Sequence, residues 1–428
     1  MSRASWLARV LVSVTALALV PAGGAGCGGG GDAAPDAADV PGSDGGPDGQ
    51  PSSCLPAGVT GELLRRAGNP RLLPGQPFGD GKISVAIADP DVRWDAAAAR
   101  YELYYSAPHA AAFGDLAEPM IRRATSPDRM AWTIDDAPVL RAAADLAAWD
   151  SERVEAPSVV YNPAAPPDRR YLMLYAGAAG PFPHPGYGPG FAIGAAFSAD
   201  GVAFTRVPAA ASPHGKEGLV LTGAQVYRAA TGAIVSDPEL ALIAGVYHLW
   251  FSSLACSGAG CASVTDLGVG HATSADGITW MIDEAPVRAL LRNISDRRSG
   301  GRKPAVVYDA ARCRYDLWLT HDAAGDVSAQ PVALDNTAGV YYAESTDGRA
   351  WLVRYDRPRD LQWTAAEAGE GLGLHAGVDV AQNGTGRLML YVGYDDEAVP
   401  AGFTLIDRAQ GTPRPGVMTL NVATRDLP

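Results

Sequence analysis

The sequence predicts an all-β protein, a five-bladed β-propeller, and three observations lead to that prediction. A serine–aspartate turn followed by an aromatic residue occurs four times, at Ser126, Ser198, Ser274 and Ser345. The spacings between these serines are 72, 76 and 71 residues, as expected of one antiparallel unit per repeat. An aromatic-rich strand precedes each turn and occurs a fifth time, as YELYYS, YLMLYAG, YHLWFSS, YDLWLTH and LMLYVGY.

The N-terminal residues are expected to be an export signal. Arg3 and Arg9 precede an apolar run and a stretch of small residues, a pattern typical of a signal peptide over residues 1–26. The sequence GAGC, which ends at Cys27, resembles the lipobox of bacterial lipoproteins, in which the cysteine is lipidated. Ordinary signal cleavage and free secretion is the alternative.

Residues 27–55 consist mainly of Gly, Pro, Asp, Ala and Ser, and they predict a disordered tether. Residues 56–428 are then the propeller. With its leader, the protein is expected in the bacterial cell envelope, lipid-anchored at the outer membrane or cell surface, or otherwise secreted. The net charge is −13 and there is no basic tract, which argues against nucleic acid as a partner. We expect the protein to be a monomer. It is expected to contact the membrane only through the lipid attached at Cys27.

Four further cysteines predict two disulfides, because an even number in an exported chain is typical of disulfide bonding. Cys256 and Cys261 lie close together in one predicted loop and are expected to form a local pair. Cys54 and Cys313 are expected on the same side of the ring in neighbouring blades. Their bond would attach the tether to the propeller.

Each blade is expected to begin with two strands joined by a short hairpin. The first strands are predicted at residues 83–94, 157–162, 238–244, 304–309 and 377–381. The second strands are predicted at residues 101–106, 170–176, 246–252, 315–321 and 387–394. A third strand leads into each serine turn and a fourth leaves it. The last blade ends with its third strand at 417–425, so residues 66–73 are expected to supply its fourth strand and close the ring.

Long connections are predicted after the second strand of every blade, at residues 107–119, 177–190, 254–266, 322–338 and 395–416. Because antiparallel strands alternate in direction, all five connections leave the propeller on one face. Functional residues gather on such loops, and we therefore expect the site there. By contrast, Asp128, Asp200, Asp276 and Asp347 are expected to be turn residues on the opposite face.

Ionisable residues are predicted where the innermost strands begin, beside the axis on the loop face. Aligned on the following Pro or Gly, the five starts are Asp89-Pro90, Glu155-Ala156-Pro157, Asp237-Pro238-Glu239, Arg302-Lys303-Pro304 and His375-Ala376-Gly377. Carboxyl groups that face one substrate, one protonated and one ionised, are what glycosidic cleavage requires.

The five repeats, the aromatic second strands and the Asp-Pro start of the first blade resemble the five-bladed propeller glycoside hydrolases. These are the arabinanase and xylosidase family (family 43) and the related invertase and levansucrase families. The resemblance implies that Asp89 is the base or nucleophile and that Asp237 or Glu239 is the acid. Glu155 stands one residue before the place of the family's second aspartate. His375 resembles the axial histidine of arabinanases, which implies a metal ion, such as calcium, near the axis.

The protein is therefore expected to act on a carbohydrate of the arabinan, xylan or fructan class. The residues expected to bind this substrate are Arg302, Lys303, His375, His184 and His321. A second interpretation stays open. In a non-catalytic surface propeller that binds a glycan or a protein, the same acids would serve only as turn caps.

Overall fold

The computed structural model confirms the predicted all-β, five-bladed propeller. It describes residues 64–69, 71–112, 117–179, 191–227, 232–257, 263–283, 302–310, 312–321, 339–353, 361–362, 373–383, 386–395, 405–406, 413–414 and 417–426. Within them, helical structure is confined to α1 (Gly223–Val226) and one 3-10 turn, Pro167–Arg169. No helix in these ranges is long and apolar enough to cross a membrane.

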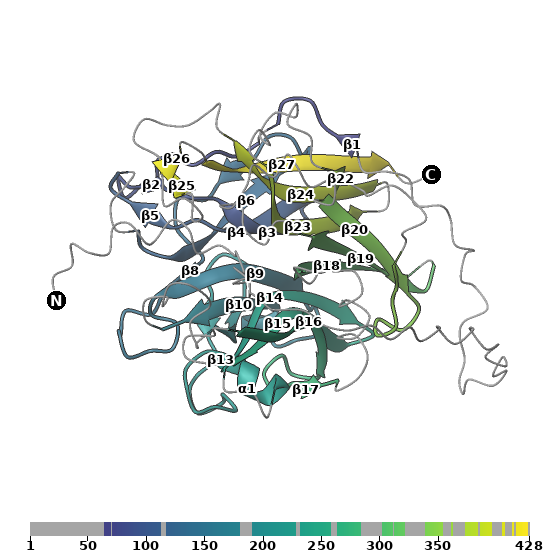
Figure 1. Ribbon diagram of the computed structural model, residues 1–428. Helices are drawn as coiled ribbons and strands as arrows, with labels where there is room; N and C mark the ends of the chain where they lie inside the picture. Colours follow the sequence, from purple (N-terminus) through teal and green to yellow (C-terminus); the bar gives the residue numbers. More distant parts are fainter. Residues whose placement is uncertain are drawn as a thin grey trace, which may run out of the picture.

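Each blade is an antiparallel sheet whose first strand lies innermost (Figure 1). Blade 1 contains β3 (Ala88–Asp95), β4 (Arg100–Ser106), β6 (Met120–Ser126), β7 (Thr133–Ile134) and β8 (Leu140–Arg141). Blade 2 contains β9 (Arg153–Tyr161), β10 (Tyr171–Ala178), β11 (Ala192–Ser198), β12 (Thr205–Arg206) and β13 (Leu219–Thr222). Blade 3 contains β14 (Gly232–Ile243), β15 (Val246–Ser257), β16 (Ser263–Ser274) and β17 (Met281–Ile282).

The two remaining blades follow the same order. Blade 4 contains β18 (Arg302–Asp309), β19 (Arg314–His321), β20 (Gly339–Ser345), β21 (Leu352–Val353) and β22 (Leu361–Gln362). Blade 5 contains β23 (Gly373–Asn383), β24 (Gly386–Asp395), β27 (Val417–Asp426) and β1 (Leu64–Arg65). Two small ribbons, β2 (Ile83–Ser84) with β5 (His109–Ala110) and β25 (Leu405–Ile406) with β26 (Pro413–Arg414), lie outside the blades.

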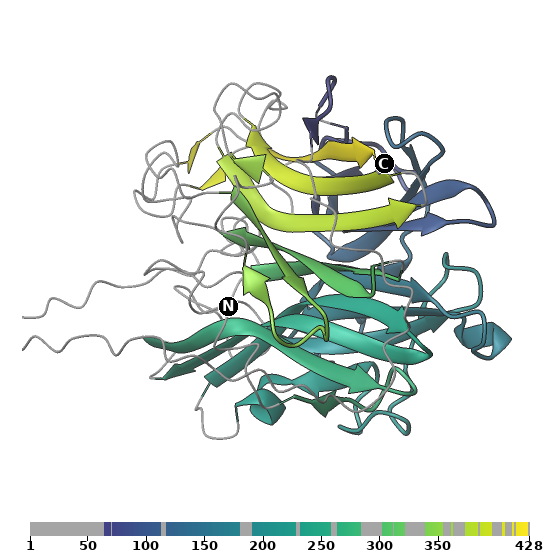
Figure 2. The same ribbon diagram turned by 90° about the vertical axis from the view of Figure 1, so that its right-hand side faces the viewer.

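The innermost strands close a ring. Each of β3, β9, β14, β18 and β23 contacts the innermost strands of both neighbouring blades, and β23 returns to β3. Blades 1 and 5 lie above blades 2 and 3 in Figure 1, and Figure 2 shows the same arrangement from the side.

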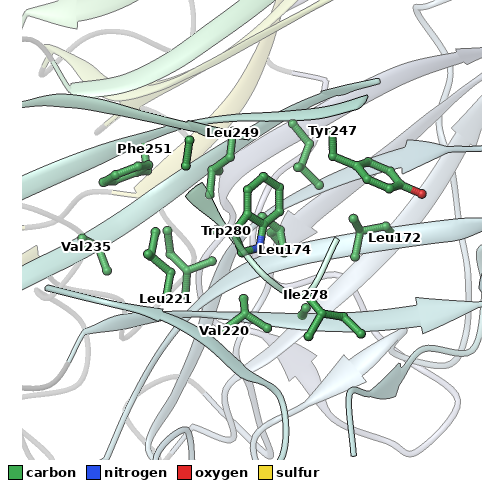
Figure 3. Close-up of a cluster of buried hydrophobic side chains, with 14 of the residues drawn as sticks. Leu172, Leu174, Val220, Leu221, Val235, Tyr247, Leu249, Phe251, Ile278 and Trp280 are labelled. Atoms are coloured by element: carbon green, nitrogen blue, oxygen red, sulfur yellow. The ribbon is translucent and has the colours of Figure 1, made fainter. Parts of the chain in front are cut away.

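The buried core of the described residues is divided among the interfaces between blades. Five clusters of apolar side chains are found, one for each pair of neighbouring blades. In the cluster between blades 2 and 3, Trp280 lies among Leu174 and Leu249 (Figure 3). Because burial of apolar area drives association of the sheets, the blades stabilise one another rather than folding around separate cores.

The N-terminal segment lies beside the last strand of blade 5. In β1, Leu64 faces Thr424 and Arg65 faces Ala423 across an antiparallel ladder with β27. Farther along, Leu72 forms a single bridge with Leu420. The fourth strand of blade 5 is predicted at residues 66–73. The ladder with β27 lies just before this range, at Leu64 and Arg65, and within the range Leu72 forms a single bridge.

Two predicted boundaries are wrong. The first strand of blade 1 does not run from Ile83, because β2 pairs with His109 and Ala110, and β3 begins at Ala88. The predicted loop of blade 3 at 254–266 is largely strand, since the ladder between β15 and β16 continues to the pair Ser257 and Ser263. Its small and β-branched residues fit a pleated sheet although they lack an alternating apolar pattern.

The four serine turns have the predicted structure, and in each the aspartate accepts from the serine hydroxyl and from two backbone N–H groups. In blade 3, Ser274 Oγ donates to Asp276 Oδ1 at 2.9 Å and accepts from the Gly277 N–H at 2.9 Å. Asp276 Oδ1 also accepts from the N–H groups of Ile278 and Thr279, at 2.9 and 2.8 Å. The aspartates are therefore turn residues, as predicted.

Two of these turns accept a hydrogen bond from the preceding blade. Tyr104 of blade 1 donates its hydroxyl to the Gly201 carbonyl in the turn of blade 2 at 2.9 Å. Trp250 Nε1 of blade 3 donates to the Gly348 carbonyl in the turn of blade 4 at 3.0 Å.

Gly277 has a φ of 75°, and a Cβ there would lie 2.6 Å from Leu172 Cδ2. Glycine is therefore required at position 277 for two reasons: its backbone adopts a positive φ, and a larger side chain would clash with Leu172 of blade 2.

Replacement of Asp276 by Ala removes an acceptor for two backbone N–H groups. By analogy with the loss of a helix cap, we expect Asp276→Ala to lower the free energy of unfolding by about 1–2 kcal/mol. Denaturant unfolding measures the change. Asp276→Asn is the matched control, because its amide oxygen still accepts, and it should lose less. Equal midpoints for Asp276→Ala and wild type would contradict the role of the turn.

A chain of two histidines and an aspartate lies between blades 3 and 4. His271 Nδ1 lies 2.7 Å from Asp283 Oδ2, and His248 Nδ1 lies 3.2 Å from His271 Nε2. Arg349 Nε, from the turn of blade 4, lies 2.8 Å from the same Asp283 oxygen. The contact between His271 and Asp283 has an equivalent in blade 1, where Arg123 donates to Asp135 at 2.6 Å. In both blades a side chain of the third strand is thus bonded to an aspartate just after the fourth strand.

Burial, together with the charges of His271 and Arg349, lowers the pKa of His248 to about 4. The unfolded chain takes up this proton near pH 6.5, whereas the folded protein resists it until about pH 4, so stability falls as the pH falls through this window. We expect the stability of His248→Gln to depend less steeply on pH than that of wild type between about pH 6.5 and 4. Thermal melts across this range test it, and an unchanged slope would contradict it.

Candidate active site

Every innermost strand is irregular at the same place near its start. In blade 1, Ala88 pairs with Ser106 and Asp91 pairs with Tyr104, so two residues of β3 face one residue of β4. The same shift occurs in blades 2 to 4, at Ala156-Pro157, Asp237-Pro238 and Lys303-Pro304. In blade 5 the register also shifts, at Ala376-Gly377, where no residue of β24 lies opposite the two. The predicted alignment of the five strand starts is therefore confirmed by the register.

In blades 1 to 3, the first residue of the bulge has a left-handed backbone conformation. The φ angles of Asp89, Ala156 and Asp237 are 51°, 49° and 46°. Such angles are uncommon for residues other than glycine and cost about 1–3 kcal/mol, which the surrounding structure must offset. Backbone strain of this kind gathers at functional sites and at bulges that redirect a side chain.

The residue after the bulge proline joins neighbouring blades. Asp91 Oδ2 accepts from the Val159 N–H at 3.1 Å, and Ser158 Oγ accepts from the Leu240 N–H at 2.9 Å. Glu239 Oε1 accepts from the Val306 N–H at 3.0 Å. Each acceptor lies one residue after the proline, and each donor lies two residues after the proline of the next blade. We call these three contacts the inter-blade bonds.

The inter-blade bonds give Glu239 a structural role that the sequence did not indicate. Its side chain is buried and occupies the position held by Asp91 in blade 1 and Ser158 in blade 2. Because those residues make the same bond, the bond does not depend on a glutamate. It depends only on an acceptor of suitable reach.

The two bulge aspartates are nearly buried, with exposed fractions of 5% for Asp89 and 7% for Asp237. Ser106 Oγ, at the end of β4, donates to Asp89 Oδ2 at 2.9 Å. Ser236 Oγ donates to Asp237 Oδ2 at 3.1 Å. Both carboxyl groups therefore accept a hydrogen bond from a serine of their own blade.

Glu155 lies two residues before its proline, in register with Ala176, and is more open than the bulge aspartates. Its Oε2 lies 3.7 Å from Arg153 Nη1 on the same strand. The register places Arg302 and His375 at the positions equivalent to Glu155, and Lys303 at the bulge. His321 is the last residue of β19. His184 lies outside the described residues.

The cysteine predictions are only partly covered by the described residues. Cys313 lies in the hairpin between β18 and β19 and is disulfide-bonded. Cys256 is in β15. Cys27, Cys54 and Cys261 lie outside the described part of the sequence, so both pairings and the lipidation remain predictions. Within that part, no group of three or more His, Cys, Asp or Glu residues is arranged to hold a metal ion, and the metal at His375 remains a prediction.

A buried cationic cluster supports the long connection of blade 1. Arg122 Nε donates to His109 Nε2 at 2.7 Å, and the Arg122 guanidinium carbon lies 3.2 Å from the centre of the Phe78 ring. Phe78 also stacks on His109. Burial lowers the pKa of Arg122 to about 10, and burial with the Arg122 charge lowers that of His109 to about 4. The only sequence signal for this cluster is the pair of arginines in β6.

No family model matches the sequence, and no curated protein matches it. Several solved structures have a similar fold. A complex of BT0996 with RGII has a TM-score of 0.56 at 13% identity, and the match covers 85% of this protein and 92% of the other. A structure described as "Glycoside hydrolase" has a TM-score of 0.55 at 12% identity, with the same coverage of 85% and 92%.

A third similar structure is an N-acetylgalactosamine deacetylase from F. plautii in complex with blood group B trisaccharide. Its TM-score is 0.54 at 13% identity, and the match covers 85% of this protein and 96% of the other. At such identities the similarity shows a shared fold. The resemblance to the propeller of glycoside hydrolases, first indicated by the repeats, is therefore confirmed as a resemblance of fold.

The bond from Val306 to Glu239 can be tested separately from any activity. Glu239→Ala leaves a buried N–H without its acceptor and should lower the free energy of unfolding by about 1–3 kcal/mol. Glu239→Gln retains an oxygen that accepts and should remain closer to wild type. Denaturant unfolding compares the three proteins. If Glu239→Ala unfolds at the wild-type midpoint, the inter-blade bond does not support the ring.

Proposed function

We propose that this protein hydrolyses a glycosidic bond, with Asp89 and Asp237 as its pair of carboxyl groups. One observation carries the proposal. The two aspartates occupy equivalent bulges in blades 1 and 3, each in a strained left-handed conformation and each nearly buried where the innermost strand begins. Carboxyl groups held in defined positions beside a common axis are the groups that glycoside hydrolysis uses.

We assign Asp89 as the base or nucleophile because the Asp-Pro start of blade 1 has this role in the glycoside hydrolases that the repeats resemble. The reaction also needs a protonated carboxyl group to donate to the leaving oxygen. We assign this role to Asp237 rather than Glu239, since Glu239 already bonds the backbone of blade 4. Glu155, more open and beside Arg153, is the third carboxyl group and would orient the substrate.

The substrate is proposed to be a furanose-containing polysaccharide of the arabinan, xylan or fructan class. The Asp-Pro start of blade 1 and the fold shared with a glycoside hydrolase support this class. Arg302, Lys303, His375, His184 and His321 are proposed to bind it. We further propose that lipidation at Cys27 retains the enzyme at the bacterial cell surface, and that the leader and tether serve this location.

A second candidate is a propeller that binds a glycan without cleaving it. The inter-blade bond of Glu239 favours this candidate, because it shows that an acid at a strand start can serve structure alone. The similar folds also include a deacetylase solved with a trisaccharide, so the fold is not confined to glycosidases.

Kinetics of four single variants on a panel of arabino-, xylo- and fructo-oligosaccharides distinguish these candidates. Asp89→Asn and Asp237→Asn should each lower kcat by about 10²–10⁴, because each removes an acid–base group from the reacting centre. Glu239→Gln should retain activity within about tenfold, and Glu155→Gln should act mainly on KM. Thermal melts of all four variants separate loss of chemistry from loss of fold.

Two results would contradict the proposal. Unchanged turnover in Asp89→Asn would remove the assigned base. Binding of an oligosaccharide by wild type, detected by calorimetry, without product from any substrate of the panel would favour the binding propeller instead.

A further inference from the structure

Ser106 makes two hydrogen bonds that together fix the direction of its proton. Its Oγ accepts from the Ala156 N–H at 2.9 Å and donates to Asp89 Oδ2 at 2.9 Å. The side chain is 4% exposed, so bulk water does not compete for either bond. A hydroxyl has one proton, and because one lone pair already accepts from the backbone, this proton is directed to the carboxylate.

This pair of bonds crosses from one blade to the next. Ala156 is the bulge residue of blade 2, the structural equivalent of Asp89, and its backbone is equally left-handed. The strained backbone of blade 2 therefore fixes the hydroxyl that holds the carboxylate of blade 1. The hydroxyl and the carboxylate are buried between rigid strands, which limits their alternative positions.

The residue at the position of Ser106 can be compared among the five blades. The register places one residue of each second strand opposite the residue before the bulge, namely Ser106, Ala176, Ser252, Thr320 and Val392. Serine occurs in the two blades whose bulge carries aspartate. The two blades whose bulge carries alanine have Ala176 and Val392 instead. Thr320 also carries a hydroxyl, in blade 4, where the bulge carries Lys303. The hydroxyl therefore accompanies a charged bulge residue and is not a requirement of the bulge.

We infer that Ser106 is a positioning residue, which holds the Asp89 carboxyl group in place for its role as base or nucleophile. Ser252 has the equivalent place in blade 3. The inference rests on the proposed function. Asp89 Oδ2 accepts the hydroxyl proton, so the hydrogen bond from Ser106 fixes the orientation of the carboxyl group. The backbone N–H of Ala156 thus acts on the reacting carboxylate through Ser106.

The test compares pH–rate profiles of wild type, Ser106→Ala, Ser106→Cys and Ser106→Thr on the substrate that wild type hydrolyses. Ser106→Ala should lower kcat about tenfold with little change in KM and should move the acidic limb of the profile, because Asp89 Oδ2 loses a donated hydrogen bond. Ser106→Cys, a poor donor of similar size, should behave like Ser106→Ala. Ser106→Thr retains the hydroxyl and should restore the wild-type profile.

Ser158→Ala is the matched control. Ser158 is a buried serine of an innermost strand that accepts a backbone N–H at 2.9 Å, but its described bond goes to blade 3 rather than to a bulge carboxylate. This variant should lose stability and keep the wild-type pH profile. A purely structural role for Ser106 would make Ser106→Ala indistinguishable from Ser158→Ala.

The failures of the inference and of the proposed function give different results. If Asp89→Asn is inactive while Ser106→Ala and Ser106→Cys have the wild-type kcat and pH profile, the inference is overturned and the proposed function stands. If Asp89→Asn is as active as wild type, the proposed function is overturned and the inference falls with it. Should Ser106→Ala not fold, Ser106→Cys and Ser106→Thr decide the question alone.

Discussion

The inter-blade bonds at the starts of the innermost strands are the constraint on which this structure depends. Asp91, Ser158 and Glu239 each hold a backbone N–H of the following blade, immediately after a bulge. At this place the backbone is strained and its ladder is interrupted, so the displaced N–H groups need acceptors. The same arrangement that joins the blades also fixes the two bulge aspartates. Stability of the ring and geometry of the candidate site therefore have one physical origin.

The outer part of the molecule relies on a second, independent contact between blades. The serine turn of one blade packs on the second strand of the preceding blade, with Gly201 and Gly348 accepting from Tyr104 and Trp250. Apolar clusters fill the space between these two levels of contact. Because the turns lie at the end of the blades remote from the bulges, substitutions in the turns and at the bulges are expected to affect stability and chemistry separately.

Much of the fold could be predicted because each blade repeats the same sequence motifs. The serine turns and aromatic strands recur at nearly constant spacing, and aligning the strands on proline identified Asp89 and Asp237 as equivalent. The roles of Ser106 and Glu239 could not be predicted, since each depends on a contact with the next blade that no local pattern records. The continuation of β15 was missed for a similar reason: its pairing with β16, rather than its composition, makes it a strand.

The central claim is that Asp89 and Asp237 act on one substrate as a pair. A crystal structure of the protein with an unhydrolysed oligosaccharide bound would measure the separation of their carboxyl groups directly. We expect about 5–5.5 Å for a retaining reaction or about 6.5–9.5 Å for an inverting one, with the glycosidic oxygen between the two groups. A much larger separation, or a sugar that contacts neither carboxyl group, would contradict it.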